Sequence, residues 1–563
     1  MIYHCEDHTC NYWDEGEKLP ERCPQCGRKL LRANEADMTG DDWTALGNTL
    51  WDAEASDKKR MVDCFRKAAY LGSAWGVCNL GICMEQGNGV EADPVQAFWL
   101  YRQAVEMGSL NAVCCLGVCY QYGIGTAPDA KQAAELYCKA AEYGSPRGQM
   151  LLARAFHDGI GVEADAAEAV YWVRAAAYQR YGEGMHRLGV CYEYGDGVEQ
   201  NWERAVHWFR EAAESGVSVA MADLGYCYEK GCGVEQSWEQ AFSWYRRGAE
   251  CGYPVSMSNL GLCYKRGYGV DQNWQEAIKW YEQGAQCGDL QSMHNLACCY
   301  ERGEGVEQNE DRALYWYRRG AEAGSDYCMY CLGWNYSNGE GVEQNMTEAI
   351  RWYTAAAEGG NADAMHDLGW HYDHGEGVEQ DMKKAICWYE RAAEQNHPAA
   401  MNSLGECYAM GRGVPRDLET AMEWYRRAAE LGEAMADYNM GWHLEQAGKL
   451  SEAYAHYRKA ADGNDDSAWW ALGRFYENGV VVAQDGKEAR RCYETGEKLG
   501  SVKCKMRLAR CKLLGIGGHR AKKAGLDLCR QALELAKESS EKEDYGYEAE
   551  MNLLRRTIAE NES

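Results

Sequence analysis

The feature that most constrains the fold is a glycine-rich segment that returns every 36 residues. It reads GDGVEQN at 195–201, GCGVEQS at 231–237, GYGVDQN at 267–273, GEGVEQN at 303–309 and 339–345, and GEGVEQD at 375–381. Self-similarity at a fixed period of roughly 20–50 residues is typical of repeat proteins. At 563 residues the chain is also too long for one ordinary core, which stops growing at roughly 250–300 residues.

A second marker keeps the same register over more of the chain. It is a Leu-Gly pair, replaced in four units by Leu-Ala or Met-Gly. The pairs begin at Leu46, Leu80, Leu116, Leu152, Leu188, Leu224, Leu260, Leu296, Leu332, Leu368, Leu404, Met440, Leu472 and Leu508. These markers predict about thirteen repeated units.

Each unit has the pattern of two helices. The first helix carries the Leu-Gly pair and usually a tyrosine four residues after the leucine, so both side chains lie on one face. The second is exemplified by NWERAVHWFREAAESG at 201–216, where alanines and Phe209 recur at helical spacing. Gly216 ends this helix, and glycine or asparagine, which tolerate positive φ, stands at most equivalent positions. Arg180 departs from this rule, so a local irregularity is expected there.

The glycine-rich segment has a second interpretation when it is taken alone. Gly-x-Gly is found in loops that cradle phosphate with backbone N–H groups at a helix N-terminus. In RGEGVEQN, however, the acidic Glu307 follows the glycines and would repel phosphate. Because the segment repeats with the period, we interpret it as the turn between the two helices, with Gly303 as a left-handed C-cap.

The Leu-Gly-x-x-Tyr pattern, the alanine and aromatic spacing of the second helix, and its closing glycine resemble the tetratricopeptide repeat. The 36-residue period and the Gly-x-Gly-Val segment are more specifically similar to the Sel-one-like repeat family, over roughly residues 41–530. This resemblance implies an all-α fold, a right-handed α/α superhelical solenoid of helix pairs. It also implies an adaptor that holds proteins together, although some cysteine-rich secreted relatives are linked to β-lactam binding or hydrolysis. Residues 531–563 are predicted to form a polar-faced capping helix, which a solenoid needs over its last apolar surface.

Composition and charge narrow the possible partners. Acidic residues outnumber basic ones 87 to 59, for a formal charge of −28. This balance disfavours nucleic acids and anionic membranes, and it favours a protein or peptide partner of basic character. The sequence has neither an apolar run of about 20 residues nor a signal-peptide pattern at its start, so we expect a cytoplasmic location, with the 27 cysteines mostly reduced.

The N-terminal segment, residues 1–35, has a different character. Two cysteine pairs, Cys5 with Cys10 and Cys23 with Cys26, have the arrangement of a zinc ribbon with four thiolate ligands. The first pair is wider than usual, so His4 or His8 is an alternative ligand. Four protein ligands would leave no open position, and Zn²⁺ would therefore be structural and supply folding energy to a very short domain. The alternative is four unrelated thiols or a disulfide pair.

Cysteine recurs three residues after the leucine marker, on the inward face of the first helix. The members are Cys83, Cys119, Cys191, Cys227, Cys263, Cys299, Cys407 and Cys511. We interpret them as small apolar core residues. His371 takes this position in one unit and shares a helix face with Asp367 and His374, so a second metal site is the alternative to a satisfied core histidine.

Catalysis has weak support in the sequence. Ser56-x-x-Lys59 and Ser539-x-x-Lys542 match a serine–lysine pattern, but neither is accompanied by S-D-N or K-T-G motifs. We predict that the protein is not an enzyme and that no residue is catalytic. A β-lactamase-like hydrolase remains the alternative.

Sites of interaction are predicted by analogy with tetratricopeptide repeats, whose first helices line a concave groove. The groove positions lie two before, two after and five after the leucine marker. Two before gives Tyr330, His366, Tyr438 and Trp470; two after gives Trp334, Trp370, Glu406 and Trp442; five after gives Glu193, Glu229, Glu301 and Asp373. Exposed Trp and Tyr are typical anchors of protein interfaces, so we expect a protein or peptide segment to bind there. The alternative is that these aromatic rings are partly buried between neighbouring helices.

Overall fold

The computed structural model describes residues 2–5, 13–15, 30–33, 38–51, 55–542 and 548–562. Near the N-terminus, the strands β1 (Ile2–Cys5), β2 (Trp13–Glu15) and β3 (Leu30–Ala33) form an antiparallel sheet in the order β2-β1-β3. Cys5 is the last residue of β1, and the other three predicted zinc ligands lie outside the described residues. The zinc site therefore stays a prediction.

The rest of the chain is helical and divides into two compact units, residues 1–292 and 293–563. In the first unit the odd-numbered helices carry the leucine markers: α1 (Gly40–Thr49), α3 (Ala74–Gln86), α5 (Leu110–Tyr122), α7 (Pro146–Asp158), α9 (Gly182–Tyr194), α11 (Ser218–Lys230) and α13 (Pro254–Arg266). The even-numbered helices are their partners: α2 (Ala55–Tyr70), α4 (Pro94–Glu106), α6 (Ala130–Glu142), α8 (Ala166–Tyr178), α10 (Trp202–Glu214), α12 (Trp238–Glu250) and α14 (Trp274–Gln286). The next odd helix, α15 (Leu290–Arg302), contains the division between the units.

The second unit continues the same alternation. Its odd-numbered helices are α17 (Asp326–Asn338), α19 (Ala362–His374), α21 (Pro398–Met410), α23 (Ala434–Gln446), α25 (Asp466–Asn478), α27 (Val502–Leu514) and α29 (Glu548–Glu562). Its even-numbered helices are α16 (Glu310–Glu322), α18 (Met346–Glu358), α20 (Met382–Glu394), α22 (Leu418–Glu430), α24 (Leu450–Asp462), α26 (Gly486–Lys498) and α28 (Lys522–Lys542).

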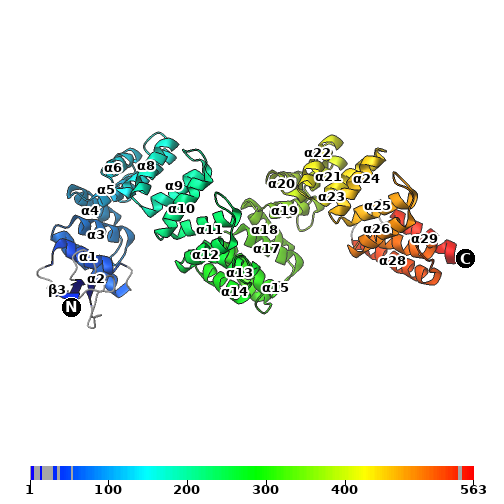
Figure 1. Cartoon of the computed structure of the whole chain (residues 1–563), viewed down its shortest axis with the longest axis horizontal. Coiled ribbons are helices and arrows are strands. Elements are labelled where there is room, and N and C mark those ends of the chain that lie inside the picture. Colours follow the sequence, from blue (N-terminus) through cyan, green and yellow to red (C-terminus); the bar gives the residue numbers. More distant parts are fainter. Residues whose placement is uncertain are drawn as a thin grey trace. The chain divides into compact units, whose positions relative to one another are not determined.

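Within each unit, consecutive helices pair and each pair packs on the next, as Figure 1 shows. In the described part of the chain, the contacts within the two units join thirteen odd–even helix pairs, in agreement with the count of about thirteen from the markers. The predicted all-α solenoid of helix pairs is confirmed.

The glycine of the Leu-Gly pair has a specific packing role. In each such unit a buried aromatic ring from the paired even helix lies directly against it. A Cβ built on Gly225 would stand 2.6 Å from the ring of Tyr245, and one on Gly189 would stand 2.6 Å from the ring of Phe209. The glycine therefore allows the two helices of a pair to close around one ring.

The glycine-rich segment is a turn, as predicted, and its parts have separate functions. The first glycine ends the odd helix in the left-handed conformation, as at Gly195 with φ of 75°. The second glycine also has positive φ and lies against the preceding helix pair, where a Cβ on Gly125 would overlap the carbonyl oxygen of Pro94. The glutamine then caps the odd helix, since Nε2 of Gln200 donates to the carbonyl oxygen of Glu193 at 2.8 Å.

The irregularity expected at Arg180 is not present. Arg180 adopts φ of 57°, the left-handed conformation that Asn396 takes at the equivalent position with φ of 61°. Its N–H donates to the carbonyl oxygen of Ala177, the bond that Gly216 makes to Ala213. The helix end therefore imposes its geometry even on a side chain that disfavours it.

The last helix, α29, covers the end of the array by packing on α27 and α28. Its anchor is the buried Glu550, whose two carboxylate oxygens accept hydrogen bonds from Nε and Nη2 of Arg507 at 2.7 and 2.8 Å. Arg507 also bonds Glu477 from its third nitrogen, at 3.3 Å. This bidentate pair connects the terminal helix to α27.

Candidate functional site

The candidate site is a row of side chains on the odd helices of the second unit. We call it the aromatic column: Trp334 on α17, Trp370 on α19, Glu406 on α21 and Trp442 on α23, each two residues after its marker. The three tryptophans are 47%, 39% and 38% exposed. Large aromatic side chains that remain open to solvent at equivalent positions of a repeat array form a surface rather than a core.

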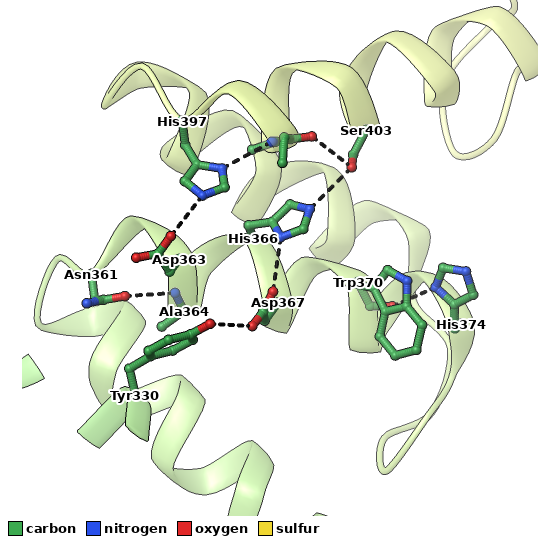
Figure 2. A network of polar contacts seen from close by, with 12 residues as sticks. Tyr330, Asn361, Asp363, Ala364, His366, Asp367, Trp370, His374, His397 and Ser403 are labelled. Atoms are coloured by element: carbon green, nitrogen blue, oxygen red, sulfur yellow. Dashed lines mark hydrogen bonds and ion pairs between the residues drawn. The ribbon is translucent and has the colours of Figure 1, made fainter. Parts of the chain in front are cut away.

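Two members of the column are held in place by neighbouring side chains. The ring of His374 stacks on Trp370 with centroids 4.3 Å apart, and its Nδ1 lies 2.9 Å from the carbonyl oxygen of Trp370 (Figure 2). Glu406 accepts hydrogen bonds from the amides of Asn402 and Asn439, each at 3.2 Å, while its side chain stays 38% exposed. These contacts reduce the rotamer entropy that binding would otherwise cost.

The residues two before the marker were predicted to face an open groove, but their side chains contact neighbouring helices instead. The hydroxyl of Tyr330 donates to Asp367 on the next odd helix at 3.0 Å, and Nε2 of His366 lies 3.5 Å from Oγ of Ser403 on the one after (Figure 2). Tyr438 packs on Tyr457, and burial raises its pKa to about 12. These side chains connect neighbouring helices and are only partly exposed.

The acidic residues five after the marker mostly accept hydrogen bonds from the buried tyrosines. Glu229 accepts from the hydroxyl of Tyr245 at 2.8 Å, and Glu301 accepts from that of Tyr317 at 3.2 Å. Asp373 is buried at 4% exposed and pairs with Nη1 of Arg412 at 3.0 Å, so it does not face an open groove.

Glu193 differs because its unit has Phe209 where the units of Glu229, Glu301 and Asp373 have tyrosine, and a phenyl ring offers no hydroxyl. Burial raises the pKa of Glu193, and the negative charge of Asp223 on the next odd helix raises it further. Glu193 is therefore the acidic groove candidate with the fewest contacts to the fold, although it is only partly exposed.

The cysteines three after the marker are core residues, as predicted. Cys227 and Cys263 are at most 2% exposed, and burial raises the pKa of each to about 12. All cysteines from Cys64 to Cys529 are free thiols. The raised pKa suppresses the thiolate forms of Cys227 and Cys263 at neutral pH, which makes these two thiols poor nucleophiles.

The alternative metal site around His371 is not supported. His371 is 5% exposed, its Nδ1 lies 3.0 Å from the carbonyl oxygen of Glu376, and burial lowers its pKa. His371 is therefore a satisfied core residue. Over the described residues, no group of three or more His, Cys, Asp and Glu side chains is placed to hold a metal ion.

The serine–lysine patterns lie on helices, Ser56 and Lys59 on α2 and Ser539 and Lys542 on α28. The side chains of Ser56, Ser539 and Lys542 lie outside the described residues.

Among the helices described, none is both long enough and apolar enough to cross a bilayer.

Comparison with known proteins gives one family. The family model described as Sel1 repeat matches residues 76–109, 112–145, 146–181, 182–217, 218–253, 254–289, 290–325, 326–361, 362–397, 398–433, 434–465 and 468–501. These matches follow the helix pairs from α3/α4 to α25/α26. A search of curated proteins found no match.

Two similar solved structures have the same repeat. One is c5321, a protective antigen of uropathogenic Escherichia coli with an SLR fold, at 30% identity over 89% of this chain and 94% of that one, with a TM-score of 0.51. The other is a Sel1 repeat protein from Oxalobacter formigenes, at 32% identity over 43% of this chain and 96% of that one, with a TM-score of 0.40.

Proposed function

The chain belongs to the Sel1 repeat family, and we propose that it is a protein-interaction scaffold whose odd-helix face binds a segment of a partner protein. Solenoids of this family generally serve as such scaffolds. The single observation that carries the proposal for this chain is the aromatic column. Trp is enriched among the residues that dominate binding energy at interfaces.

The chemistry of the column suggests the kind of segment it takes. Three tryptophans favour a segment with apolar side chains. Glu406 lies between Trp370 and Trp442 and, although Arg412 stands 3.8 Å from it, its side chain stays 38% exposed and can accept from one basic side chain of that segment. The net charge of −28 would draw a basic partner toward the whole chain. The residues two before and five after the marker serve to fix the helices that present the column.

The placement of the column on the odd helices supports the odd-helix face as the binding surface. In the second unit, the odd helices α25 and α27 contact each other directly, and in the first unit α5 contacts α7. Helices that approach one another across repeats lie on the inner side of the curve of a solenoid, the side such proteins use for extended binding surfaces.

The proposal predicts a selective loss of partners. Trp334→Ala, Trp370→Ala and Trp442→Ala combined should remove the proteins that the wild type captures, as identified by affinity purification and mass spectrometry. The matched control combines Trp99→Ala, Tyr171→Ala and Tyr315→Ala, three exposed aromatics of even helices. Unchanged capture by the folded first variant would contradict the proposal.

The N-terminal segment is proposed to hold structural Zn²⁺ through Cys5, Cys10, Cys23 and Cys26, and the protein to act in the cytoplasm. Purified wild-type protein should contain about one zinc per chain, because four thiolates saturate tetrahedral Zn²⁺. Cys23→Ser should lose most of it, measured by atomic emission. Near-zero zinc in both proteins would contradict this part of the proposal.

Neither the comparisons nor the described residues favour the hydrolase alternative.

A further inference from the structure

A tyrosine or phenylalanine ring occupies one equivalent position in most even helices, and we call this the core aromatic position. Its members are fully buried: Phe65, Tyr101, Tyr137, Phe209, Tyr245, Tyr281, Tyr317, Tyr353, Tyr389, Tyr425, Tyr457 and Tyr493. Because the position repeats, each member defines the surroundings that this fold builds around an aromatic ring.

Tyr353 shows these surroundings. Its ring lies 5.8 Å from the ring of Tyr330 on α17 and 5.5 Å from that of His371 on α19. Burial and the charge of Asp367 raise the pKa of its hydroxyl, while a hydrogen bond with Ser337 opposes them. These four neighbours stand at fixed positions relative to the leucine markers. Tyr330 and Ser337 lie two before and five after the marker of the same unit. Asp367 and His371 lie one before and three after the marker of the next unit.

Two even helices lack an aromatic ring at this position: α28 has the buried Cys529 there, and α8 has the buried Val173. A cavity of about 320 Å³ lies there between α7, α8 and α9. Its lining includes Met150, His157, Arg187 and Cys191, which stand at the same four positions relative to the markers as the neighbours of Tyr353. The cavity is therefore the space in which the fold elsewhere encloses a phenol ring.

Most polar groups of the cavity lining are paired with one another, while Glu183 of the lining accepts from the hydroxyl of Tyr181 at 3.2 Å. His157 lies 2.7 Å from Asp158 and 3.3 Å from Asp196, and Arg187 lies 3.5 Å from Asp196. Arg154 pairs with Asp158 at 3.5 Å and remains exposed at the rim. Because the paired charges offset each other and Glu183 is already hydrogen-bonded, a neutral ring with one hydroxyl suits the site better than an ion.

The polar end of the cavity matches a hydroxyl. In several other units the residue five after the marker accepts from the tyrosine hydroxyl, as Glu85 does from Tyr101 at 2.6 Å and Glu477 from Tyr493 at 2.7 Å. His157 stands at that position here, with Asp196 and Arg187 beside it. A phenol hydroxyl entering the cavity would find both donors and acceptors.

We propose that this cavity binds the side chain of a tyrosine from a partner protein, which takes the place left by Val173. The protein source of the ring rests on the proposed scaffold function, whereas the fit of the ring to the cavity does not. The site lies in the first unit and does not involve the aromatic column.

The test uses the full chain and N-acetyl-L-tyrosinamide as the probe. Calorimetric titration should give a dissociation constant of roughly 0.1–1 mM, the range of a fragment-sized ligand. Val173→Tyr should fill the cavity from within and weaken binding at least tenfold. Ala153 stands where most units have the glycine of the Leu-Gly pair, but it leaves room for this ring. In another unit Ala297 stands at the equivalent position, and that unit holds the buried Tyr317. The control Val255→Tyr, at an exposed position, should bind as the wild type does.

A measurement on the wild type alone locates the probe. Of the methionine methyl groups, that of Met150, which lines the cavity, should show the largest NMR shift upon titration. N-acetyl-L-phenylalaninamide should bind several-fold more weakly, because it leaves the polar end unpaired. Absence of binding, or an unmoved Met150 methyl, would overturn the proposal. Binding of p-cresol without binding of the tyrosinamide would overturn the protein source of the ring, while leaving the scaffold function to its own test.

Discussion

Gly125→Ala is expected to lower the free energy of unfolding of the first unit by about 3–5 kcal/mol. At φ of 67°, any side chain costs about 1–2 kcal/mol relative to glycine. In addition, the new Cβ would overlap the carbonyl oxygen of Pro94 in the preceding helix pair. Since this oxygen belongs to the backbone, the clash is relieved only by moving one helix pair away from the next. Urea denaturation followed by circular dichroism measures the loss.

The matched control for this substitution is Gly108→Ala. Gly108 also has positive φ, 90°, but a Cβ there would meet nothing within 4 Å. It should therefore show only the conformational cost of about 1–2 kcal/mol. Equal losses for the two variants would mean that the second glycine of the turn has no role in stacking the repeats.

The second large effect is expected at the end of the array, from Glu550→Ala. This change leaves the largely buried guanidinium of Arg507 without its bidentate partner, and breaking such a pair costs about 3–5 kcal/mol. Because the main contacts of α29 among the described residues are with α27 and α28, the loss should be local. Hydrogen–deuterium exchange of residues 548–562 should approach the rate of an unprotected segment, while α17 to α23 remain protected.

Glu548→Ala is the control for the cap, since Glu548 is an exposed residue of the first turn of the same helix. It should leave the exchange of α29 nearly unchanged. If Glu550→Ala also leaves the exchange unchanged, the apolar contacts of Met551 and Leu554 hold the helix without the ion pair.

The repeat period predicted the fold because every marker has a physical function that recurs with it. Gly225 receives the ring of Tyr245, Gly195 ends a helix with positive φ, and Gln200 caps the carbonyl oxygen of Glu193. Each of these is a contact within one unit, so the spacing along the sequence determines it. The helix pairs could therefore be predicted without structural information.

The interaction surface could be predicted only in part, since its details depend on contacts between units. The helical period places Tyr330 on the same side as Trp334, but it does not show that the hydroxyl of Tyr330 is occupied by Asp367 of the next unit. Similarly, the burial of Asp373 depends on Arg412, which lies 39 residues away. The three tryptophans two after the marker stay exposed, whereas Glu406 at the same position accepts a hydrogen bond from Asn439 of the next unit.

The cavity at Val173 was missed although the sequence carried its signal. Val173 interrupts a run of aromatic residues at one position of the even helices, an interruption that recurs at Cys529 in α28. A search for what a repeat lacks, in addition to what it repeats, would have identified the site.

The central claim is that the aromatic column binds the partner, and one titration tests it most directly. The binding segment of a captured partner is titrated calorimetrically into the wild type and into the variant that combines Trp334→Ala, Trp370→Ala and Trp442→Ala. Because each interface tryptophan contributes roughly 1–2 kcal/mol or more, we predict at least about 100-fold weaker binding by the variant and unchanged binding by the Trp99, Tyr171 and Tyr315 control. Equal affinity of the wild type and the folded column variant would contradict the account.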